Sequence, residues 1–184
     1  LSGGEYASGY WTFNANPQHD ETIAVNGVTF TFKYPGVTVA GGGSTPQNGS
    51  FPCVGMFGDR PQYQGGEDAT YIRRIDDTWY SLNEGFEYVY LAESDAFFPY
   101  DATNWELGEQ GLAPVPTFTK DISAFTAVQV EIGETLADTI TNFITTLNAS
   151  VNASINVATY TAGEERGKVI GTYDTQGTGG NSFT

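Results

Sequence analysis

The chain of 184 residues contains few of the side chains on which nucleophilic and metal chemistry depends. Its one cysteine, Cys53, excludes an intrachain disulfide and any zinc or iron–sulfur site made of several cysteines. Its one histidine, His19, lies in a polar turn, and no serine or cysteine near it has the setting of an activated nucleophile. No G-x-S-x-G, H-E-x-x-H or P-loop motif is present. We therefore expect His19 to be an exposed turn residue and the protein to have no enzymatic activity.

Basic residues and long apolar runs are also scarce. Seven Lys and Arg stand against 22 Asp and Glu, which leaves a formal net charge of −15. Such a charge repels the phosphates of nucleic acids and of anionic lipids, so we expect no direct binding to nucleic acid. A transmembrane helix needs a run of about 18 apolar residues, and the sequence contains none. We therefore expect no contact with a membrane.

The acidic residues are dense between Ile75 and Thr119, a stretch that contains no Lys or Arg. Such a surface can face solvent, face a basic partner or collect cations. Loop-like sequence also holds five carboxylates that could bind calcium, namely Asp59, Glu67, Asp68, Asp76 and Asp77. The ordered ligand spacing of an EF-hand is absent. We predict no cofactor and keep bound calcium as an alternative.

A β-hairpin is the clearest element of the first third. Asn26-Gly27 lies between two strand-like segments and favours a two-residue type I′ turn. After the turn, Phe30 and Phe32 alternate with threonines, which predicts one buried face and one exposed face. The strands predicted in this region are residues 10–14, 21–25, 28–32 and 37–40. The Gly-rich residues 41–49 are predicted to form a loop tip.

One amphipathic helix is predicted at about 135–148. Thr135-Leu-Ala-Asp138 resembles a capping box, so the helix should begin there. The apolar residues at helical spacing are Leu136, Ile140, Phe143, Ile144 and Leu147. The neighbouring predicted strands are residues 128–132, 155–160 and 168–173. We expect Phe143 and Ile144 to share one core with Phe30 and Phe32.

These elements predict a β-rich α+β fold. An antiparallel sheet or sandwich with one flanking helix would bury the apolar face of each predicted strand and of the helix. Residues 35–125 form a large insertion that is rich in aromatic residues, with predicted strands at 70–75 and 86–91. Its rings can form either a second small core or a binding surface, because Tyr and Trp dominate interface hot spots. The candidate surface rings are Trp79, Tyr80, Tyr88, Tyr90 and Trp105.

The two ends of the chain together resemble a module found in structural proteins of tailed bacteriophages. Residues 8–17 and the hairpin segment 21–32 carry the first part of the resemblance. The strand, Gly133, the helix and the closing run from Tyr173 to Phe183 carry the second part. The strand and helix modules of flagellar hook-associated proteins are distantly similar. The resemblance implies one domain over residues 1–184, with a core module of 8–34 and 126–183 that is interrupted by the insertion 35–125.

The resemblance implies a virion component that is made in the host cytoplasm and binds other virion proteins and copies of itself. A capsid decoration (cement) protein in a symmetric array is the first expectation, since an acidic chain suits a crowded outer surface. Its docking residues on an acidic capsid would be Arg60, Arg73 and Arg74. A tail tube or other tail protein is the alternative within this class. In a different class, a carbohydrate-binding adhesion module would stack its exposed rings on sugars, so ring exposure separates the two classes.

Overall fold

The computed structural model describes residues 6–65 and 70–174, which divide into two compact units. Unit 1 is made of residues 1–33 and 125–184, and unit 2 of residues 34–124. Unit 2 spans nearly the same residues as the predicted insertion, and unit 1 nearly the same residues as the predicted module. The chain thus divides into two compact units close to the predicted border between module and insertion.

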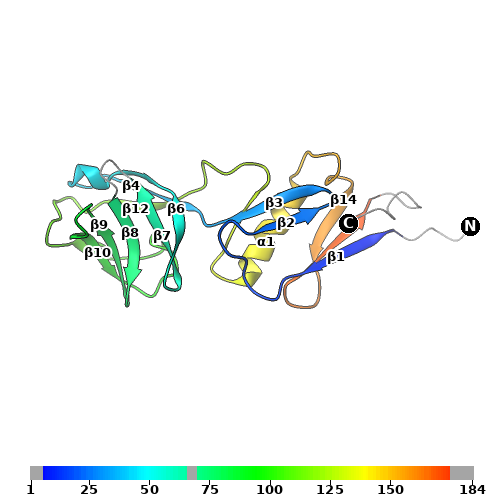
Figure 1. Cartoon of the computed structure of the whole chain (residues 1–184), viewed down its shortest axis with the longest axis horizontal. Helices are drawn as coiled ribbons and strands as arrows, with labels where there is room; N and C mark the ends of the chain where they lie inside the picture. Colours follow the sequence, from blue (N-terminus) through cyan, green and yellow to red (C-terminus); the bar gives the residue numbers. More distant parts are fainter. Residues whose placement is uncertain (1–5, 66–69, 175–184) are drawn as a thin grey trace, which may run out of the picture. The chain divides into compact units, whose positions relative to one another are not determined.

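Unit 1 contains two three-stranded sheets and one α-helix (Figure 1). Its elements are β1 (Ser8–Thr12), β2 (Thr22–Val25), β3 (Val28–Lys33), β13 (Gln129–Glu131), α1 (Leu136–Asn148), β14 (Ala158–Ala162) and β15 (Lys168–Tyr173). The strand orders are β1-β15-β14 and β13-β3-β2, and α1 packs on β13, β14 and β15. All pairs are antiparallel except β13, which runs parallel to β3. The predicted β-rich α+β class with one flanking helix is confirmed.

The hairpin of β2 and β3 has the predicted turn. Asn26 and Gly27 have φ angles of 47° and 80°, the positive values that a type I′ turn requires. Phe30 and Phe32 are buried, whereas Thr29, which lies between Val28 and Phe30 in the strand, is exposed. The predicted alternation of a buried and an exposed face is therefore confirmed.

Helix α1 begins at the predicted capping box. The Asp138 N–H donates to the Thr135 hydroxyl at 3.2 Å, and the Thr135 N–H donates to the Asp138 carboxylate at 3.0 Å. Asn16 adds two tertiary bonds, because its Nδ2 donates to the Gly133 carbonyl at 3.0 Å and its Oδ1 accepts from the Thr139 hydroxyl at 2.6 Å. These bonds tie the start of the helix to the segment that follows β1.

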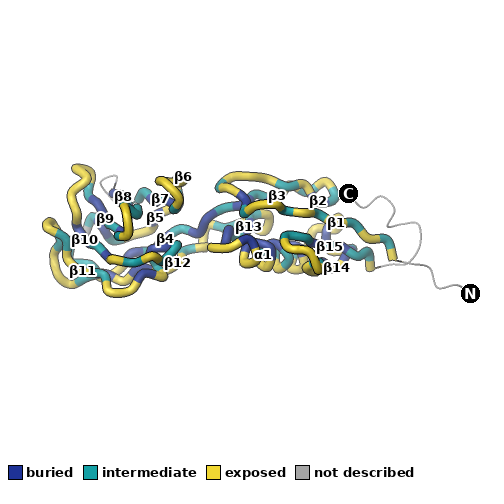
Figure 2. The backbone as a smooth tube through the Cα atoms, turned by 90° about the horizontal axis from the view of Figure 1, so that it is seen from below, coloured by how far each residue is buried: buried dark blue, intermediate teal, exposed yellow. Residues whose placement is uncertain are grey.

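Phe143 lies at the centre of the core of unit 1. Its ring centroid is 5.7 Å from that of Phe13, 5.9 Å from that of Phe30 and 5.6 Å from that of Phe32. Figure 2 shows the buried residues of α1 in dark blue beside exposed turns in yellow. Ile144 is only half-buried, because it lies at the border of the narrow apolar stripe of α1. The predicted shared core is thus confirmed for the three phenylalanines that the prediction named, and Ile144 is at its margin.

Unit 2 consists of two antiparallel sheets. Its elements are β4 (Gly36–Ala40), the 3₁₀ turn Thr45–Gln47, β5 (Gly49–Phe51), β6 (Cys53–Phe57), β7 (Arg60–Gly65), β8 (Thr70–Ile75), β9 (Thr78–Leu82), β10 (Tyr88–Glu93), β11 (Glu106–Leu107) and β12 (Thr117–Asp121). The six-stranded sheet has the order β11-β10-β9-β8-β7-β6, and the three-stranded sheet has the order β12-β4-β5. Residues from both sheets form one core that includes Val37, Phe51, Tyr63, Trp79 and Phe118. The insertion therefore has a core of its own, one of the two roles predicted for its rings.

Several predicted boundaries and environments need correction. Strands β6, β7, β9, β11 and β12 are absent from the prediction, and β5 begins inside the predicted loop tip. Strand β14 begins at Ala158, because the preceding residues form a turn. His19 is partly buried rather than exposed, and this burial lowers the pKa of its imidazole. Among the described residues, no helix has the length and apolar character to cross a membrane.

Candidate interaction surface

Two of the five rings proposed as surface anchors belong to the core of unit 2. Trp79 and Tyr90 are both 0% exposed. The Trp79 Nε1 donates to the Ala96 carbonyl at 3.0 Å. The Tyr90 hydroxyl donates to the Leu112 carbonyl at 3.0 Å and accepts from the Ser44 N–H at 2.9 Å. Because their polar atoms are satisfied inside the fold, neither ring can stack on a ligand without unfolding.

The other three candidate rings are more accessible. Trp105 is half-buried, with its ring stacked on Phe118 at 3.7 Å and its Nε1 bonded to the Pro99 carbonyl. Tyr80 is half-buried and Tyr88 is 41% exposed, and their ring centroids lie 4.5 Å apart. The Tyr80–Tyr88 pair is therefore the part of the predicted ring set that remains open to a partner.

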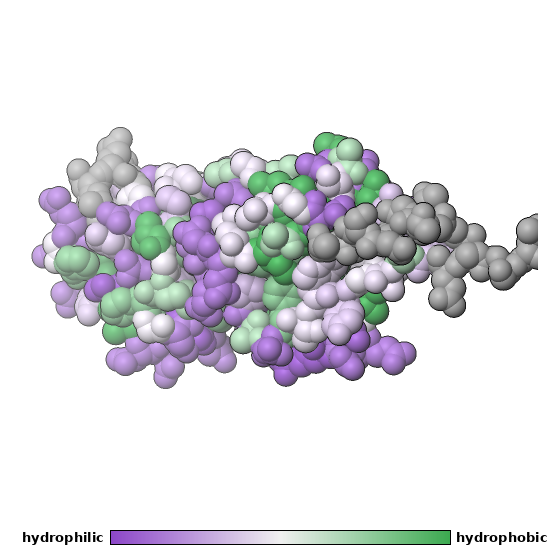
Figure 3. All heavy atoms as spheres, turned by 45° about the vertical axis from the view of Figure 1, so that its right-hand side comes forward, coloured by the Kyte–Doolittle hydropathy of each residue, from purple (hydrophilic) through white to green (hydrophobic). Residues whose placement is uncertain are grey.

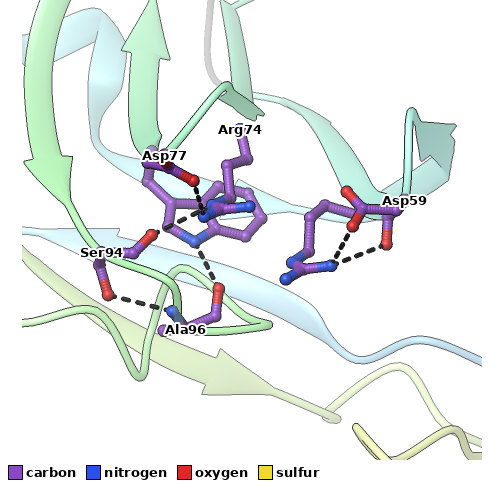
Figure 4. Close-up of polar contacts among 7 residues, drawn as sticks. Asp59, Arg74, Asp77, Ser94 and Ala96 are labelled. Carbon is purple, nitrogen blue, oxygen red and sulfur yellow. Dashed lines mark hydrogen bonds and ion pairs between the residues drawn. The ribbon is translucent and has the colours of Figure 1, made fainter.

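Two of the three candidate arginines have carboxylate partners within unit 2. The Arg74 guanidinium lies 3.0 Å from the Asp77 carboxylate and donates to the Ser94 carbonyl at 3.1 Å (Figure 4). The Arg74 side chain is 9% exposed. The Arg60 guanidinium lies 2.6 Å from the Asp59 carboxylate. Both guanidinium groups have a carboxylate partner in unit 2, so neither is a free positive charge for an acidic capsid.

Arg73 lies on the opposite face of β8 from Arg74, because neighbouring residues of a strand alternate between faces. Its guanidinium carbon is 4.6 Å from the ring centroid of Phe57 and 5.1 Å from that of Phe86. Its Nε is buried without a hydrogen-bond partner, and no described carboxylate pairs with it. The three arginines therefore do not form one basic patch, and Arg73 is held by aromatic faces.

Arg73 is the centre of an aromatic group on the face of the six-stranded sheet that points away from the core. We name as the outer-face cluster Phe57, Tyr71, Arg73, Tyr80, Phe86 and Tyr88. Tyr71 stacks on Phe86 at 5.4 Å, and Arg73 faces Tyr80 across the ladder. Phe57 is 40% exposed and Phe86 is 51% exposed. Aromatic rings and arginine are the residues that most often anchor protein interfaces, so this cluster is the candidate interaction surface.

Sequence reasoning missed Phe57, Tyr71 and Phe86 as members of this surface. A signal existed for Tyr71, because it alternates with buried Ile72 in a predicted strand. Phe86 has a positive φ of 59° in the turn before β10. No periodicity can place a turn residue on a face, and β6, which carries Phe57, lacks regular alternation.

The carboxylates considered for calcium are dispersed or already engaged. Asp59 and Asp77 pair with arginines, and Asp76 lies in the β8–β9 turn with a φ of 51°. Glu67 and Asp68 lie outside the described residues. Across residues 6–65 and 70–174, no group of three or more His, Cys, Asp or Glu side chains could hold a metal ion.

A recess of about 280 Å³ in unit 2 is a second candidate site. Its polar lining includes Gln47 and Asn83. The Gln47 amide accepts from the Ser81 hydroxyl and donates to the Leu82 carbonyl. Asn83 exchanges two hydrogen bonds with Glu87, at 2.8 and 2.9 Å. Because the fold uses these amides, the outer-face cluster is the stronger candidate.

Four hydrogen bonds hold the Asp121 carboxylate at the end of β12. The Thr38 and Ser50 hydroxyls donate to one oxygen at 3.2 and 2.9 Å. The Ser123 N–H and hydroxyl donate to the other oxygen at 2.9 and 2.6 Å. These bonds, that of the Ser123 hydroxyl foremost, lower the pKa of Asp121 from 3.8 to about 2. The carboxylate thereby ties β12 to β4 and β5.

We expect Asp121→Asn to remove an acid-sensitive part of the stability of unit 2. Since the folded-state pKa lies below the ordinary value of 3.8, the carboxylate stabilises the fold above about pH 4, and this contribution is lost toward pH 2. At neutral pH the wild type should be more stable by on the order of 1 kcal/mol for a water-screened group. Urea unfolding of both proteins at neutral pH and near pH 2 tests this. A difference that does not change with pH would contradict it.

On the face drawn in Figure 3, hydrophobic residues form separate spots among hydrophilic ones. The outer-face cluster can bind by stacking, by apolar contact and by the cation–π face of Arg73. Its polar groups are the hydroxyls of three tyrosines and the guanidinium of Arg73. Comparison of the chain with protein-family models, with curated proteins and with solved structures found no match.

Proposed function

We propose that the chain is a non-enzymatic structural protein of a tailed-bacteriophage particle, where it binds other virion proteins and copies of itself. One observation carries the proposal. The two distant segments that resemble a phage virion module fold together into unit 1, with its hairpin, parallel strand β13 and capped helix. Unit 2 is a separate compact body inserted between them, with its own core. An assembly module that carries an inserted body is suited to presenting that body on a particle.

Capsid decoration is the role that we favour within this class. A net charge of −15 keeps a protein soluble at the high local concentration of a capsid surface. The outer-face cluster offers unit 2 an anchor of rings around Arg73, as protein contacts require. A tail tube subunit is the alternative, because a sheet with one flanking helix would also serve there.

Immunogold electron microscopy of purified particles tests the proposal. Antibodies raised against the purified chain would be applied to particles from the phage or host that encodes it. We expect gold on the heads, while gold confined to tails would move the role to the tail. Absence of label from particles that still bind an antibody to another structural protein would contradict the proposal as a whole.

A carbohydrate-binding adhesion module is the second candidate, and the Tyr80–Tyr88 pair favours it. The two rings lie side by side at 4.5 Å, and Tyr88 is 41% exposed. Sugar rings stack on such exposed aromatic faces. Two other rings that this candidate would need, Trp79 and Tyr90, are buried, and for that reason we place it second.

A glycan array distinguishes the two candidates. We expect the wild-type protein to leave the array unlabelled. If the adhesion candidate holds, a glycan will be retained, and Tyr88→Ala should weaken its binding roughly tenfold, the equivalent of one lost stacking ring. Tyr10→Ala is the matched control, because Tyr10 is 68% exposed but lies in unit 1. Retention that is lost on Tyr88→Ala and kept on Tyr10→Ala would overturn our preference.

A further inference from the structure

Strand β6 is an open edge of the six-stranded sheet. It pairs with β7 on one side, and no other described strand lies on its second side. Met56 faces Pro61 across the ladder, and proline has no N–H to donate. The two residues therefore form a non-hydrogen-bonded pair, which turns the N–H and C=O of Met56 toward the open side. The edge presents a backbone donor and acceptor to any strand that approaches.

The β6 edge also lacks charged side chains that would oppose pairing. Residues 51–58 contain no charged side chain, in a chain whose net charge is −15. Val54 is 50% exposed and Met56 is 38% exposed. Natural edge strands are commonly guarded by lysine, proline or inward charges, and β6 carries none of these. A bulge lies between Cys53 and Gly55, where Gly55 has a positive φ of 135°, so the regular part of the edge is Met56 and Phe57.

The opposite edge of the same sheet is different. Strand β11 is only two residues long, Glu106 and Leu107, and Glu109 follows shortly after. A short edge with carboxylates resists strand addition, since two such edges repel each other. Of the two edges of the six-stranded sheet, β6 alone offers an uncharged and apolar strip.

We propose that β6 pairs with β6 of a second copy of the chain, antiparallel about a twofold axis. The second copy is the occupant because identical antiparallel edges are self-complementary, so Val54 and Met56 of each copy cover those of the other. Two strongly acidic chains approach at least cost along a strip without carboxylates. Pairing would also cover Phe57 and extend the outer-face cluster across both copies. This contact rests on the proposed function for its role in a particle, where it supplies one of the contacts between copies.

Met56→Lys in the full chain tests the pairing by sedimentation velocity over a concentration series. We expect the wild type to shift from monomer to dimer with rising concentration, and the variant to remain monomeric. Around the twofold axis the two new lysines would repel each other and would need water that the paired edge excludes. The substitution makes the net charge less negative, so greater overall repulsion between chains cannot explain the loss.

Leu107→Lys is the matched control, because it makes the same change of charge on the β11 edge and should leave the dimer intact. Val54→Lys, also exposed, repeats the test if Met56→Lys unfolds. In the wild type, exchange of the Met56 amide hydrogen should slow at least tenfold at concentrations that favour the dimer. A wild type that stays monomeric, or lysine variants of β6 that dimerise as well as it does, would overturn the pairing. Gold on particles in either case would leave the proposed function standing.

Discussion

Phe143→Ala is expected to lower the free energy of unfolding of unit 1 by about 3–5 kcal/mol. The side chain is fully buried, and the rings of Phe13, Phe30 and Phe32 all lie within 5.9 Å of its ring centroid. Truncation would leave a cavity between the hairpin and the helix. Backbone hydrogen bonds hold both elements in place, so they cannot move to close the cavity. Amide hydrogen exchange in β3 and α1, measured with increasing urea, reports this loss.

Ile144→Ala is the control for the Phe143 prediction. It lies next to Phe143 on α1 but is only half-buried, so we expect its truncation to cost about 1 kcal/mol. Phe143→Asp should prevent unit 1 from folding, since it would bury a charge without a partner. Equal costs for the two alanine variants, or a folded Phe143→Asp protein, would show that Phe143 is not at the centre of this core.

Trp79→Ala is expected to destabilise unit 2 by about 3–5 kcal/mol. Trp79 is 0% exposed, packs near Tyr63 with ring centroids 6.4 Å apart, and donates from Nε1 to the Ala96 carbonyl. Its removal would leave a large cavity between the two sheets and an unpaired carbonyl. Hydrogen exchange of the amides of β8 and β9 should accelerate accordingly.

Phe86→Ala is the matched control in unit 2. Its ring is 51% exposed in the outer-face cluster, so truncation should change the stability of unit 2 by less than about 1 kcal/mol. The two variants separate the two roles of aromatic residues in this unit, stability and surface. If Phe86→Ala were as destabilising as Trp79→Ala, the outer-face cluster would be part of a core rather than an interaction surface.

The fold of unit 1 was largely predictable because its signals are local. The Asn26-Gly27 turn fixes the hairpin register, and the exchange of bonds between Thr135 and Asp138 fixes the helix start. The parallel pairing of β13 with β3 was not predictable, because it depends on contacts between segments about 100 residues apart. The turn before β14 was also not predictable, because its β-branched residues favour a strand.

Unit 2 was less predictable because its strands break the usual patterns. Strand β7 begins with Arg60-Pro61, and Pro61 is tolerated only because its ladder position needs no N–H. Strand β6 contains Gly55 at a bulge, which interrupts the alternation. Shorter strands such as β12 depend on partners from distant sequence, which no local pattern reveals.

The candidate surface differs in membership from the ring set predicted from the sequence. Aromatic residues of the insertion do form a surface with an arginine, yet Trp79 and Tyr90 are in the core, and Phe57, Tyr71 and Phe86 are in the cluster. A strand pattern shows which residues share a face, but it does not show which face a second sheet will cover. The strand pattern also does not show which arginine of β8 has a carboxylate partner. Asp77, in the turn that follows β8, pairs with Arg74 and not with Arg73.

The copy number of the chain in purified particles tests most directly whether it is a structural component of a virion. Quantitative mass spectrometry of gradient-purified particles, with the major capsid protein as the reference, provides this number. We predict many copies per particle, in a fixed ratio to the major capsid protein and resistant to washing with salt. A chain that is absent from the particles and remains in the soluble fraction of the lysate would contradict the proposed role.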